Sequence, residues 1–321
     1  MYKRMLVPLD GSQAAEVAFP FAKALAGRLG IAVSLLHISN PALKEYQPMI
    51  KAYVDQAADI IRSGAVKVQR QLYPTVEPKP PEVKGALVIG YPPDEILRYA
   101  DEKAVDLILV AAHGRSTSKR WAIGSVADKV LRAAKVPVLL VPGAAIQQPP
   151  FDRLPTRTLI VPLDGSELAE SVLPHVESLA GEQSRGIVEV VLVRACEPPA
   201  MPTYYSPELS EIPLHWAQYA QQETARCKQV STDYLAGVER KLRSNGINVR
   251  SEVLVGKASD EIVSYANKIP DGIVVMATHG RSGLSRLVYG SVALNILVGV
   301  SNPILLVKPT ASTSKTPTKQ A

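Results

Sequence analysis

The sequence predicts an α/β protein of two tandem domains, each a doubly wound sheet of five parallel strands. The chain has 321 residues, enough for two domains of ordinary size. Its second half repeats the landmarks of its first half in the same order. Within each half, short aliphatic runs typical of buried parallel strands alternate with stretches of helical length. Right-handed crossovers would then place one ligand crevice per half at the carboxyl ends of the strands.

The internal repeat is defined by constant offsets between matching residues. Asp10 matches Asp164 at an offset of 164 − 10 = 154, and Ile38 matches Ala195 at 195 − 38 = 157. Four later landmarks all share an offset of 166: Gly90 with Gly256, His113 with His279, Gly124 with Gly290, and Pro137 with Pro303. The step from 157 to 166 predicts a nine-residue insertion between Ala195 and Gly256. The predicted domains are 1–142 and 158–309, with a linker at 143–157 and a disordered tail at 310–321.

Each half begins with a strand that ends in Pro-Leu-Asp-Gly-Ser and leads into a helix rich in Ala and Leu. The predicted strands are 5–9 and 158–163, and the predicted helices are 13–29 and 167–180. Each helix carries a proline ten residues after its aspartate, Pro20 or Pro174. Because proline removes a backbone donor and clashes with the preceding turn, we expect each helix to be kinked or interrupted there.

The remaining elements of each half follow in the same order. A second strand, a long helix, a third strand ending in glycine, a short helix, and fourth and fifth strands are predicted. In the first half, in that order, these elements lie at 32–37, at 46–72, up to Gly90, around 94–97, at 107–110 and at 136–141. In the second half, in the same order, they lie at 187–194, at 216–244, up to Gly256, around 260–263, at 273–276 and at 303–307.

The fourth strand of each half runs into a glycine turn and then, nine residues later, into Gly-Ser and another helix. Glycine lets backbone N–H groups approach a ligand closely, and a helix start supplies unpaired donors and a positive dipole end. We expect Ser291 to occupy the N-cap position of its helix. Together with Asp10 or Asp164 at the end of the first strand, these Gly-Ser stretches predict an anion site in each half.

Several polar residues near these stretches have two interpretations. Asp10 and Asp164 are either turn formers or hydrogen-bond acceptors for a ligand. His113 and His279 lack a neighbouring carboxylate or nucleophile in sequence, which favours a structural or ligand-edge role over catalysis. The basic residues of the nine-residue loops either meet phosphates or form a solvated surface: Arg115, Lys119, Arg120, Arg281 and Arg286.

Composition limits the remaining classes of function. The net charge is +6, but Lys308, Lys315 and Lys319 lie at or beyond the last strand, so the folded part is only mildly basic. No basic helix or array of stacking aromatics supports nucleic-acid binding. No signal peptide or membrane span is predicted, and we expect a cytoplasmic protein. Cys196 and Cys227 have no metal spacing and form no disulfide framework, so we expect separate buried or incidental thiols.

Two apolar surfaces predict contacts between domains or subunits. The fifth strands are apolar on both faces, and a strand at a sheet edge offers unpaired backbone groups. We therefore expect the two fifth strands to pair in an intrachain pseudo-dimer. The helix after Gly290 carries Leu294, Ile296, Leu297 and Val298 all round its surface, so we expect a domain or subunit interface to cover it.

These motifs resemble the universal stress protein family in its tandem two-domain form. Both halves carry Val-Pro-Leu-Asp-Gly-Ser and, at the fourth strand, His-Gly-Arg-Ser followed by Gly-Ser-Val-Ala. The resemblance implies an adenine nucleotide alpha hydrolase-like fold, ATP binding in many members, and dimers through the fifth strand. One departure is that Ala111 and Ala277 stand where the ATP-binding motif has its first glycine.

By position, the resemblance implies two sets of nucleotide-binding residues, with no catalytic residue and no metal ligand. The first set is Pro8, Leu9, Asp10, Ile38, Ala111, Gly114, Gly124, Ser125 and Val126; the second is Pro162, Leu163, Asp164, Ala195, Ala277, Gly280, Gly290, Ser291 and Val292. The leading hypothesis is a stress-response or signalling module that binds ATP, with or without Mg²⁺. The alternatives are a slow ATPase or phosphotransferase, and a nucleotide-free dimerisation scaffold that acts through partners. Under any of these hypotheses, a homodimer could form besides the intrachain pseudo-dimer.

Overall fold

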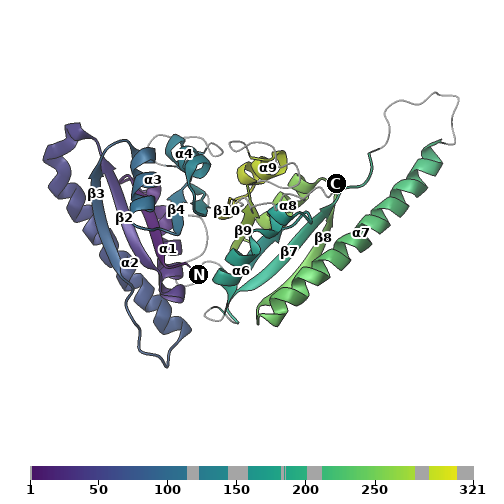
Figure 1. Cartoon of the computed structure of the whole chain (residues 1–321), viewed down its shortest axis with the longest axis horizontal. Helices are drawn as coiled ribbons and strands as arrows, with labels where there is room; N and C mark the ends of the chain where they lie inside the picture. The colour runs from purple at the N-terminus through teal and green to yellow at the C-terminus, as the bar shows by residue number, and fades with distance from the viewer. Residues whose placement is uncertain are drawn as a thin grey trace, which may run out of the picture.

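The computed structural model describes residues 2–113, 123–143, 158–181, 184, 186–200, 212–278 and 289–308. Strands and helices alternate along the first half of the chain (Figure 1). They are β1 (Arg4–Leu9), η1 (Ala15–Ala18), α1 (Phe19–Leu29), β2 (Ala32–Ser39), η2 (Pro41–Tyr46), α2 (Gln47–Leu72), β3 (Val83–Ile89), α3 (Pro92–Glu102), β4 (Leu107–Ala111), α4 (Ser125–Ala133) and β5 (Val138–Val141).

The second half repeats this order with a different opening helix. Its elements are β6 (Thr158–Pro162), α5 (Glu167–Glu170), α6 (Leu173–Ala180), β7 (Glu189–Cys196), α7 (Ile212–Ser244), β8 (Asn248–Val255), α8 (Ala258–Asn267), β9 (Gly272–Ala277), α9 (Ser291–Gly299) and β10 (Ile304–Val307). The predicted fold class is therefore confirmed.

The two halves share one continuous ten-stranded sheet, in the order β3-β2-β1-β4-β5-β10-β9-β6-β7-β8. Neighbouring strands are parallel within each half. At the centre, β5 and β10 pair antiparallel, with Leu139 opposite Leu305. The expected pairing of the fifth strands is thus present within this single chain, and each strand loses the exposed edge that it would otherwise present.

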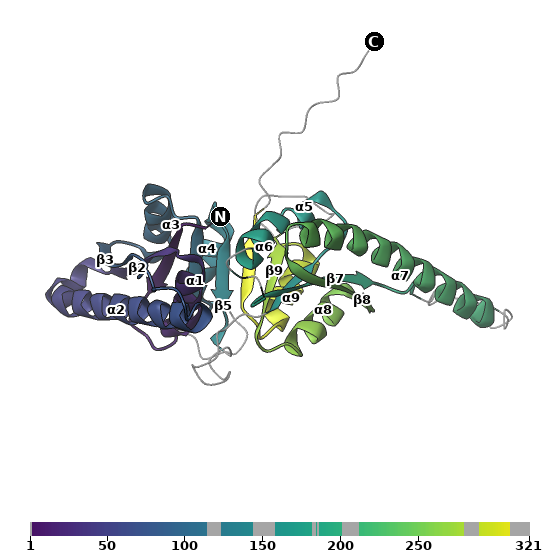
Figure 2. The same ribbon diagram turned by 90° about the horizontal axis from the view of Figure 1, so that it is seen from below.

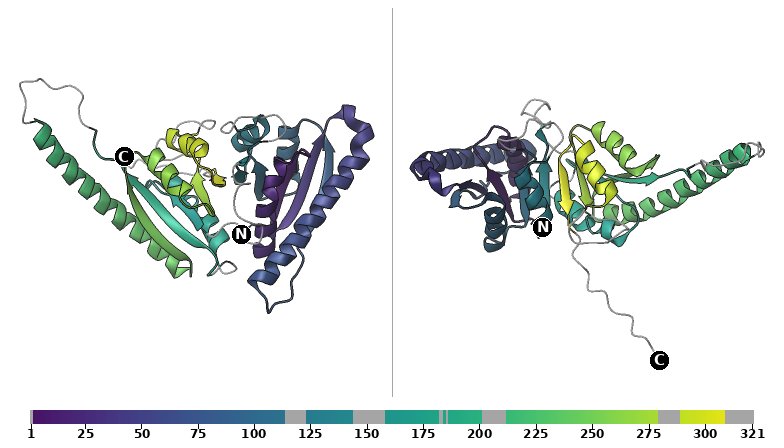
Figure 3. Two further views of the ribbon diagram at one scale, coloured as in Figure 1. Left: turned by 180° about the vertical axis from the view of Figure 1, so that it is seen from behind. Right: turned by 90° about the horizontal axis from the view of Figure 1, so that it is seen from above.

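Helices cover both faces of the sheet (Figure 2). One apolar cluster joins α1, α2, α5, α6 and α7 to one face, and a second joins α3, α4, α8 and α9 to the other. Each cluster contains residues of both halves, so the core on each face continues across the β5–β10 pair. Figure 3 shows the two halves from behind and from above, with the long helices α2 and α7 at opposite sides.

The two prolines interrupt their helices as expected. α1 begins at Phe19 and α6 at Leu173, so that Pro20 and Pro174 each fall in a first turn. A first turn tolerates proline because its N–H groups have no partner within the helix. The residues before each break form the separate short segments η1 and α5.

The long helices α2 and α7 match at a different offset from the strands around them. Tyr53 on α2 donates to Glu16 at 3.0 Å, and Tyr234 on α7 donates to Glu170 at 2.8 Å, which gives an offset of 234 − 53 = 181. Compared with the first half, the second half therefore has 181 − 157 = 24 more residues between its second strand and its long helix. It has 181 − 166 = 15 fewer residues between the long helix and the end of its third strand. The predicted nine-residue insertion is the net of these two changes.

This register leaves part of α7 without a counterpart. Gln47, where α2 begins, matches residue 47 + 181 = 228, so residues 212–227 of α7 are additional. We call these residues the α7 extension. In Figure 1 this part of α7 projects beyond the sheet toward the upper right.

The expectation of two separate thiols is wrong. Cys196, the last residue of β7, forms a disulfide with Cys227 on α7, and their Cα atoms are 5.9 Å apart. Since the two cysteines are 31 residues apart along the chain, only the packing of α7 beside the end of β7 brings them together. The bond joins the last residue of the α7 extension to the sheet.

The outer face of α9 is not covered by the described part of the chain. Val292, Leu294 and Val298 are 42%, 42% and 40% exposed. No described residue of the other domain covers this face, since α9 packs on α8 and the sheet through its opposite side, which includes Ala293, Ile296 and Leu297. The expected subunit interface stays a prediction.

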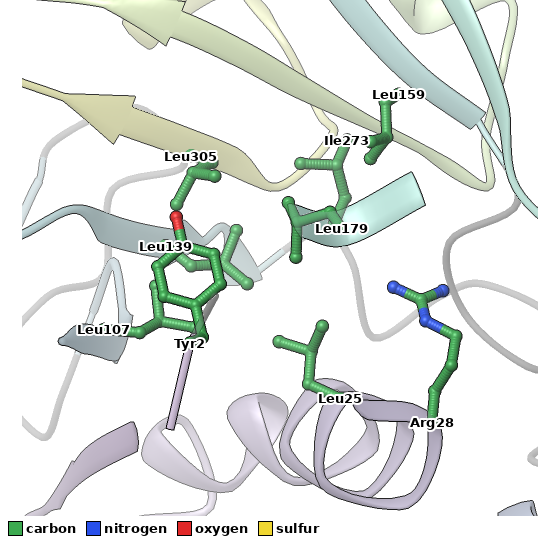
Figure 4. Close-up of a pocket in the computed structure, with 9 residues that line it drawn as sticks. All are labelled: Tyr2, Leu25, Arg28, Leu107, Leu139, Leu159, Leu179, Ile273 and Leu305. Atoms are coloured by element: carbon green, nitrogen blue, oxygen red, sulfur yellow. The ribbon is translucent and has the colours of Figure 1, made fainter. Parts of the chain in front are cut away.

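A small, mostly apolar cavity lies between the halves (Figure 4). It is lined by Tyr2, Leu25, Arg28, Leu107, Leu139, Leu159, Leu179, Ile273 and Leu305. Burial lowers the pKa of Arg28 to about 10 because it removes the guanidinium from water. Leu107 begins β4 and Leu159 is the second residue of β6, so this cavity lies toward the amino ends of the strands and away from the predicted crevices.

We predict that Leu305→Ala lowers the free energy of unfolding by about 2–5 kcal/mol, the usual cost of truncating a buried leucine. Leu305 is 1% exposed and sits in the strand pair that joins the halves. Urea-induced unfolding followed by circular dichroism measures the change. Val298→Ala, on the exposed face of α9, is the control and should shift stability by no more than about 0.5 kcal/mol. Equal effects of the two substitutions would contradict the assigned packing.

One hydrogen bond between the halves predicts a pH dependence. The Tyr2 hydroxyl lies 2.8 Å from Nδ1 of His175 and donates to it when the ring is neutral. Burial lowers the pKa of His175, so the native state takes up a proton less readily than the unfolded chain. Stability should therefore fall as the pH drops below the unfolded value of about 6.5.

The His175→Gln variant should lose less stability than the wild type between pH 7 and pH 5, a range set by the unfolded histidine pKa of about 6.5. The urea midpoint at each pH measures this. Parallel curves for the two proteins would show that His175 makes no contribution.

Candidate functional site

Asp10 and Asp164 form matching turns directly after the first strand of each half. Asp164 Oδ1 accepts hydrogen bonds from the backbone N–H of Ser166 at 2.9 Å and from its hydroxyl at 2.6 Å. Asp10 makes the same two contacts with Ser12. The turn-forming interpretation is therefore present in both halves, and all the contacts just named use Oδ1 alone.

The backbone conformation and the close packing of Gly165, which follows Asp164, explain why this position is a glycine. Gly165 has φ +85°, and a Cβ there would lie 3.1 Å from Nη1 of Arg194. An L-residue would be both strained and crowded at this position. The turn therefore holds Asp164 close to the end of β7.

The Gly-Ser helices start beside the ends of the fourth strands. The N–H of Gly124 donates to Ala112 O at 2.7 Å, and the N–H of Gly290 donates to Thr278 O at 3.3 Å. These bonds fix the starts of α4 and α9 at the carboxyl ends of β4 and β9. The positive ends of both helix dipoles consequently lie where the topology predicts a crevice.

The N-cap of each of these helices is the glycine, not the serine. Gly124 and Gly290 are the caps, and no side chain caps either helix. The expected N-cap role of Ser291 is therefore wrong by one residue, because Ser291 already has helical geometry. By contrast, α5 is capped by Ser166, whose hydroxyl accepts from the N–H of Ala169 at 3.1 Å.

The two cap glycines differ in their surroundings. Gly290 has φ −57° and ψ 152°, which any residue adopts, and no described atom lies within 4 Å of where its Cβ would be. A Cβ on Gly124 would lie 3.2 Å from Ala112 O. Neither conformation nor packing among the described residues therefore requires glycine at position 290.

The structure places the predicted site residues as follows. The first two strands of each half end at the same edge as the fourth strand and the Gly-Ser helix. Pro8 and Leu9 end β1, Ile38 is next to last in β2, Ala111 ends β4, and Val126 is in α4; Pro162 ends β6 with Leu163 after it, Ala195 is next to last in β7, Ala277 ends β9, and Val292 is in α9.

Some of the predicted residues lie outside the described residues. These are Gly114, Gly280 and His279, together with the basic residues of the nine-residue loops, Arg115, Lys119, Arg120, Arg281 and Arg286. His113 is described, and its Nε2 is buried with no hydrogen-bond partner among the described residues.

A polar cluster beside Asp164 was missed in the sequence. Arg194, near the end of β7, places its guanidinium carbon 4.8 Å from the centre of the Tyr234 ring. Tyr234 in turn donates to Glu170 at 2.8 Å. Burial and the Glu170 carboxylate raise the pKa of Tyr234, so the phenol stays protonated and continues to donate.

The first half has the same tyrosine–glutamate pair but a different strand residue. Tyr53 donates to Glu16, and the residue that matches Arg194 is His37, since 194 − 157 = 37. Aligning the long helices at an offset of 181 would have revealed the repeated pair. The carboxyl edge of the second half therefore has a permanent guanidinium charge where that of the first half has a buried histidine.

Among the described residues, no group of three or more His, Cys, Asp or Glu side chains could hold a metal ion. Within the same ranges, no helix combines the length and the apolar character that a bilayer span needs.

Comparison with known proteins decides the family. The profile described as the universal stress protein family matches residues 1–142 and 155–308. The chain belongs to the universal stress protein family. Among curated members, Rv2005c of Mycobacterium tuberculosis is 23% identical over 310 residues, covering 95% of this chain and 96% of its own length. The match spans both halves, so the tandem form is shared.

Solved universal stress proteins share the fold. A structure from Archaeoglobus fulgidus DSM 4304 has a TM-score of 0.62 at 17% identity, covering 95% of this chain and 98% of that one. Another universal stress protein from Archaeoglobus fulgidus was solved in complex with dAMP. It has a TM-score of 0.33 at 24% identity and covers 43% of this chain and 97% of its own.

We predict that Ser166→Ala lowers the free energy of unfolding by about 1 kcal/mol, because α5 loses its cap. The matched control is Ser291→Ala, which should change stability by less than about 0.5 kcal/mol because Ser291 does not cap α9. Urea-induced unfolding of the wild type and of both variants measures these changes in the free energy of unfolding. A larger loss in Ser291→Ala than in Ser166→Ala would overturn the cap assignment.

Proposed function

We propose that this universal stress protein binds an adenine nucleotide, ATP, in a stress-response or signalling role. The observation that carries the proposal is the start of α9, where an uncapped helix begins at a glycine that neither conformation nor described packing requires. A helix start of this kind attracts phosphate through its N–H groups and its dipole. Close approach of a ligand to the backbone is a physical reason for glycine there.

The proposed contacts are those that the family resemblance implies. Phosphates would lie against Gly290, Ser291 and Val292, and the ribose and adenine would lie near Asp164 and the backbone of Ala195. The matching first-half site would use Gly124, Ser125 and Val126 with Asp10 and Ile38. All the residues just named lie at the carboxyl edge of the sheet.

We favour the second crevice for two reasons. A Cβ at Gly290 would meet no described atom, whereas one at Gly124 would meet Ala112 O at 3.2 Å. Arg194 also adds a fixed positive charge near Asp164, and a guanidinium suits a polyanionic ligand. The first crevice has His37 at the matching position.

We predict that Gly290→Val removes ATP binding at the second crevice, because a branched side chain would occupy the space beside the helix start. Isothermal titration calorimetry should show either the loss of one binding site or an affinity lower by about tenfold or more, equivalent to about 1.4 kcal/mol. Gly143→Val is the matched control for the second crevice, since a Cβ at Gly143 also meets nothing within 4 Å and Gly143 follows β5 in the first half.

Three outcomes separate the hypotheses. Unchanged stoichiometry and affinity in Gly290→Val would reject the second crevice as the site. No binding by the wild type at millimolar ATP, and no nucleotide released on denaturation, would favour the nucleotide-free scaffold. Steady phosphate release with ATP and Mg²⁺ would favour the slow ATPase.

A further inference from the structure

We propose that the Cys196–Cys227 disulfide is a thiol–disulfide exchange site that fastens the α7 extension to the carboxyl end of β7. Reduction would release the extension, and oxidation would dock it. The site belongs to the second half alone. Three features support this: where the two cysteines lie, how α7 is packed on either side of Cys227, and which of the two cysteines is the more exposed residue.

The packing of α7 changes at the disulfide. From residue 231 onward the helix buries one side chain per turn against the sheet, at Ser231, Leu235, Val238 and Leu242. Within 216–226, no side chain is buried; each is exposed or half-buried. Tyr219 is 48% exposed, and its ring pairs with Trp216 on the extension itself. The extension therefore has little apolar contact to hold it in place.

The covalent bond supplies the attachment that packing does not. Cys196 is fully buried at the end of β7, and its Sγ also lies 3.7 Å from the carbonyl oxygen of Thr224 on the extension. A helix that extends about 24 Å past its packed part, at about 1.5 Å per residue over 16 residues, is expected to fray if nothing holds it. The disulfide joins the extension to the sheet at its base, where the packed part begins.

The two cysteines differ in exposure, which favours one direction of exchange. As whole residues, Cys227 is half-buried and Cys196 is fully buried. A thiolate of an external dithiol would attack Cys227 Sγ, forming a mixed disulfide and breaking the bond to Cys196, whose thiolate leaves and takes up a proton. The second thiol of the reductant then displaces Cys227 as a thiol. The dithiol is oxidised to its disulfide, and the protein gains two electrons and two protons.

The first half provides an internal control. The residue that matches Cys196 is Ser39, since 196 − 157 = 39, and α2 has no counterpart of the α7 extension. Cys196 directly follows Ala195 and lies two residues after Arg194, at the second crevice. Redox state would therefore change the second crevice and leave the first unaffected, a consequence that rests on the proposed nucleotide function.

Alkylation under native conditions tests the exchange itself. The chain has two cysteines, so mass spectrometry after iodoacetamide treatment counts free thiols directly. The oxidised protein should take no label, and the folded protein treated with dithiothreitol should take a label on Cys227, with a second label on Cys196 only if release of the extension uncovers it. Labelling of the untreated protein, or resistance to dithiothreitol until the protein is denatured, would overturn the proposal.

Hydrogen exchange tests the attachment without any nucleotide. On reduction, the amides of 216–226 should exchange about tenfold faster or more, as expected for a local release. The amides of 231–244 and of α2 should be unchanged. Cys227→Ser should behave like the reduced wild type and should not respond to dithiothreitol. Cys196→Ser removes the same bond and takes its place if Cys227→Ser does not fold. Equal exchange of 216–226 in the oxidised and reduced proteins would refute the attachment.

ATP titration of the oxidised and reduced protein then tests the link to the crevice. A change confined to the site that Gly290→Val removes would support the link, and identical titrations would reject it. If the wild type binds no ATP, the proposed function fails, and the labelling and exchange results still decide whether the disulfide is an exchange site.

Discussion

The antiparallel pairing of β5 with β10 is the contact on which the architecture depends. Each strand is fully buried and would be an open edge in an isolated half. Pairing satisfies both rows of backbone groups and makes one ten-stranded sheet. It also continues the apolar core on both faces across the boundary between the halves, so that each half contributes to the stability of the other.

The repeat on this shared sheet places different side chains at the carboxyl edges of the two halves. Both halves keep the aspartate turn after the first strand. Both also keep the tyrosine–glutamate hydrogen bond that joins the long helix to the short helical segment after that turn. They differ in His37 against Arg194, and in the crowding around Gly124 against the open space at Gly290. A fixed scaffold with a few changed residues at its carboxyl edge is the usual way in which a fold acquires distinct sites.

The second half also carries a structural addition that the first half lacks. The α7 extension has few apolar contacts, and a covalent bond joins its last residue to the sheet. Ligand-binding loops and the elements that move in allostery are usually drawn from segments of low local stability. The extension is joined to the strand that carries Arg194, so the differences between the two halves are concentrated in the second.

The sequence by itself determined the fold class, the repeat, the order of elements, the helix breaks at Pro20 and Pro174, and the pairing of the fifth strands. Each of these follows from a local signal: aliphatic runs, proline geometry, or apolar residues on both faces of a strand. Ser291 was expected at the N-cap of its helix, whereas the cap is Gly290, because cap position depends on backbone angles that sequence does not fix.

Only the tertiary structure decided which distant residues meet. The Cys196–Cys227 bond and the Arg194–Tyr234 contact each join β7 to α7, across a stretch where the repeat changes register by 24 residues. Spacing along the chain carries no information on such contacts, because they depend on how the long helix lies on the sheet. The sequence also did not predict that the outer face of α9 is exposed among the described residues. An apolar helix surface indicates that its burial is favourable, but it does not indicate which surface covers the helix.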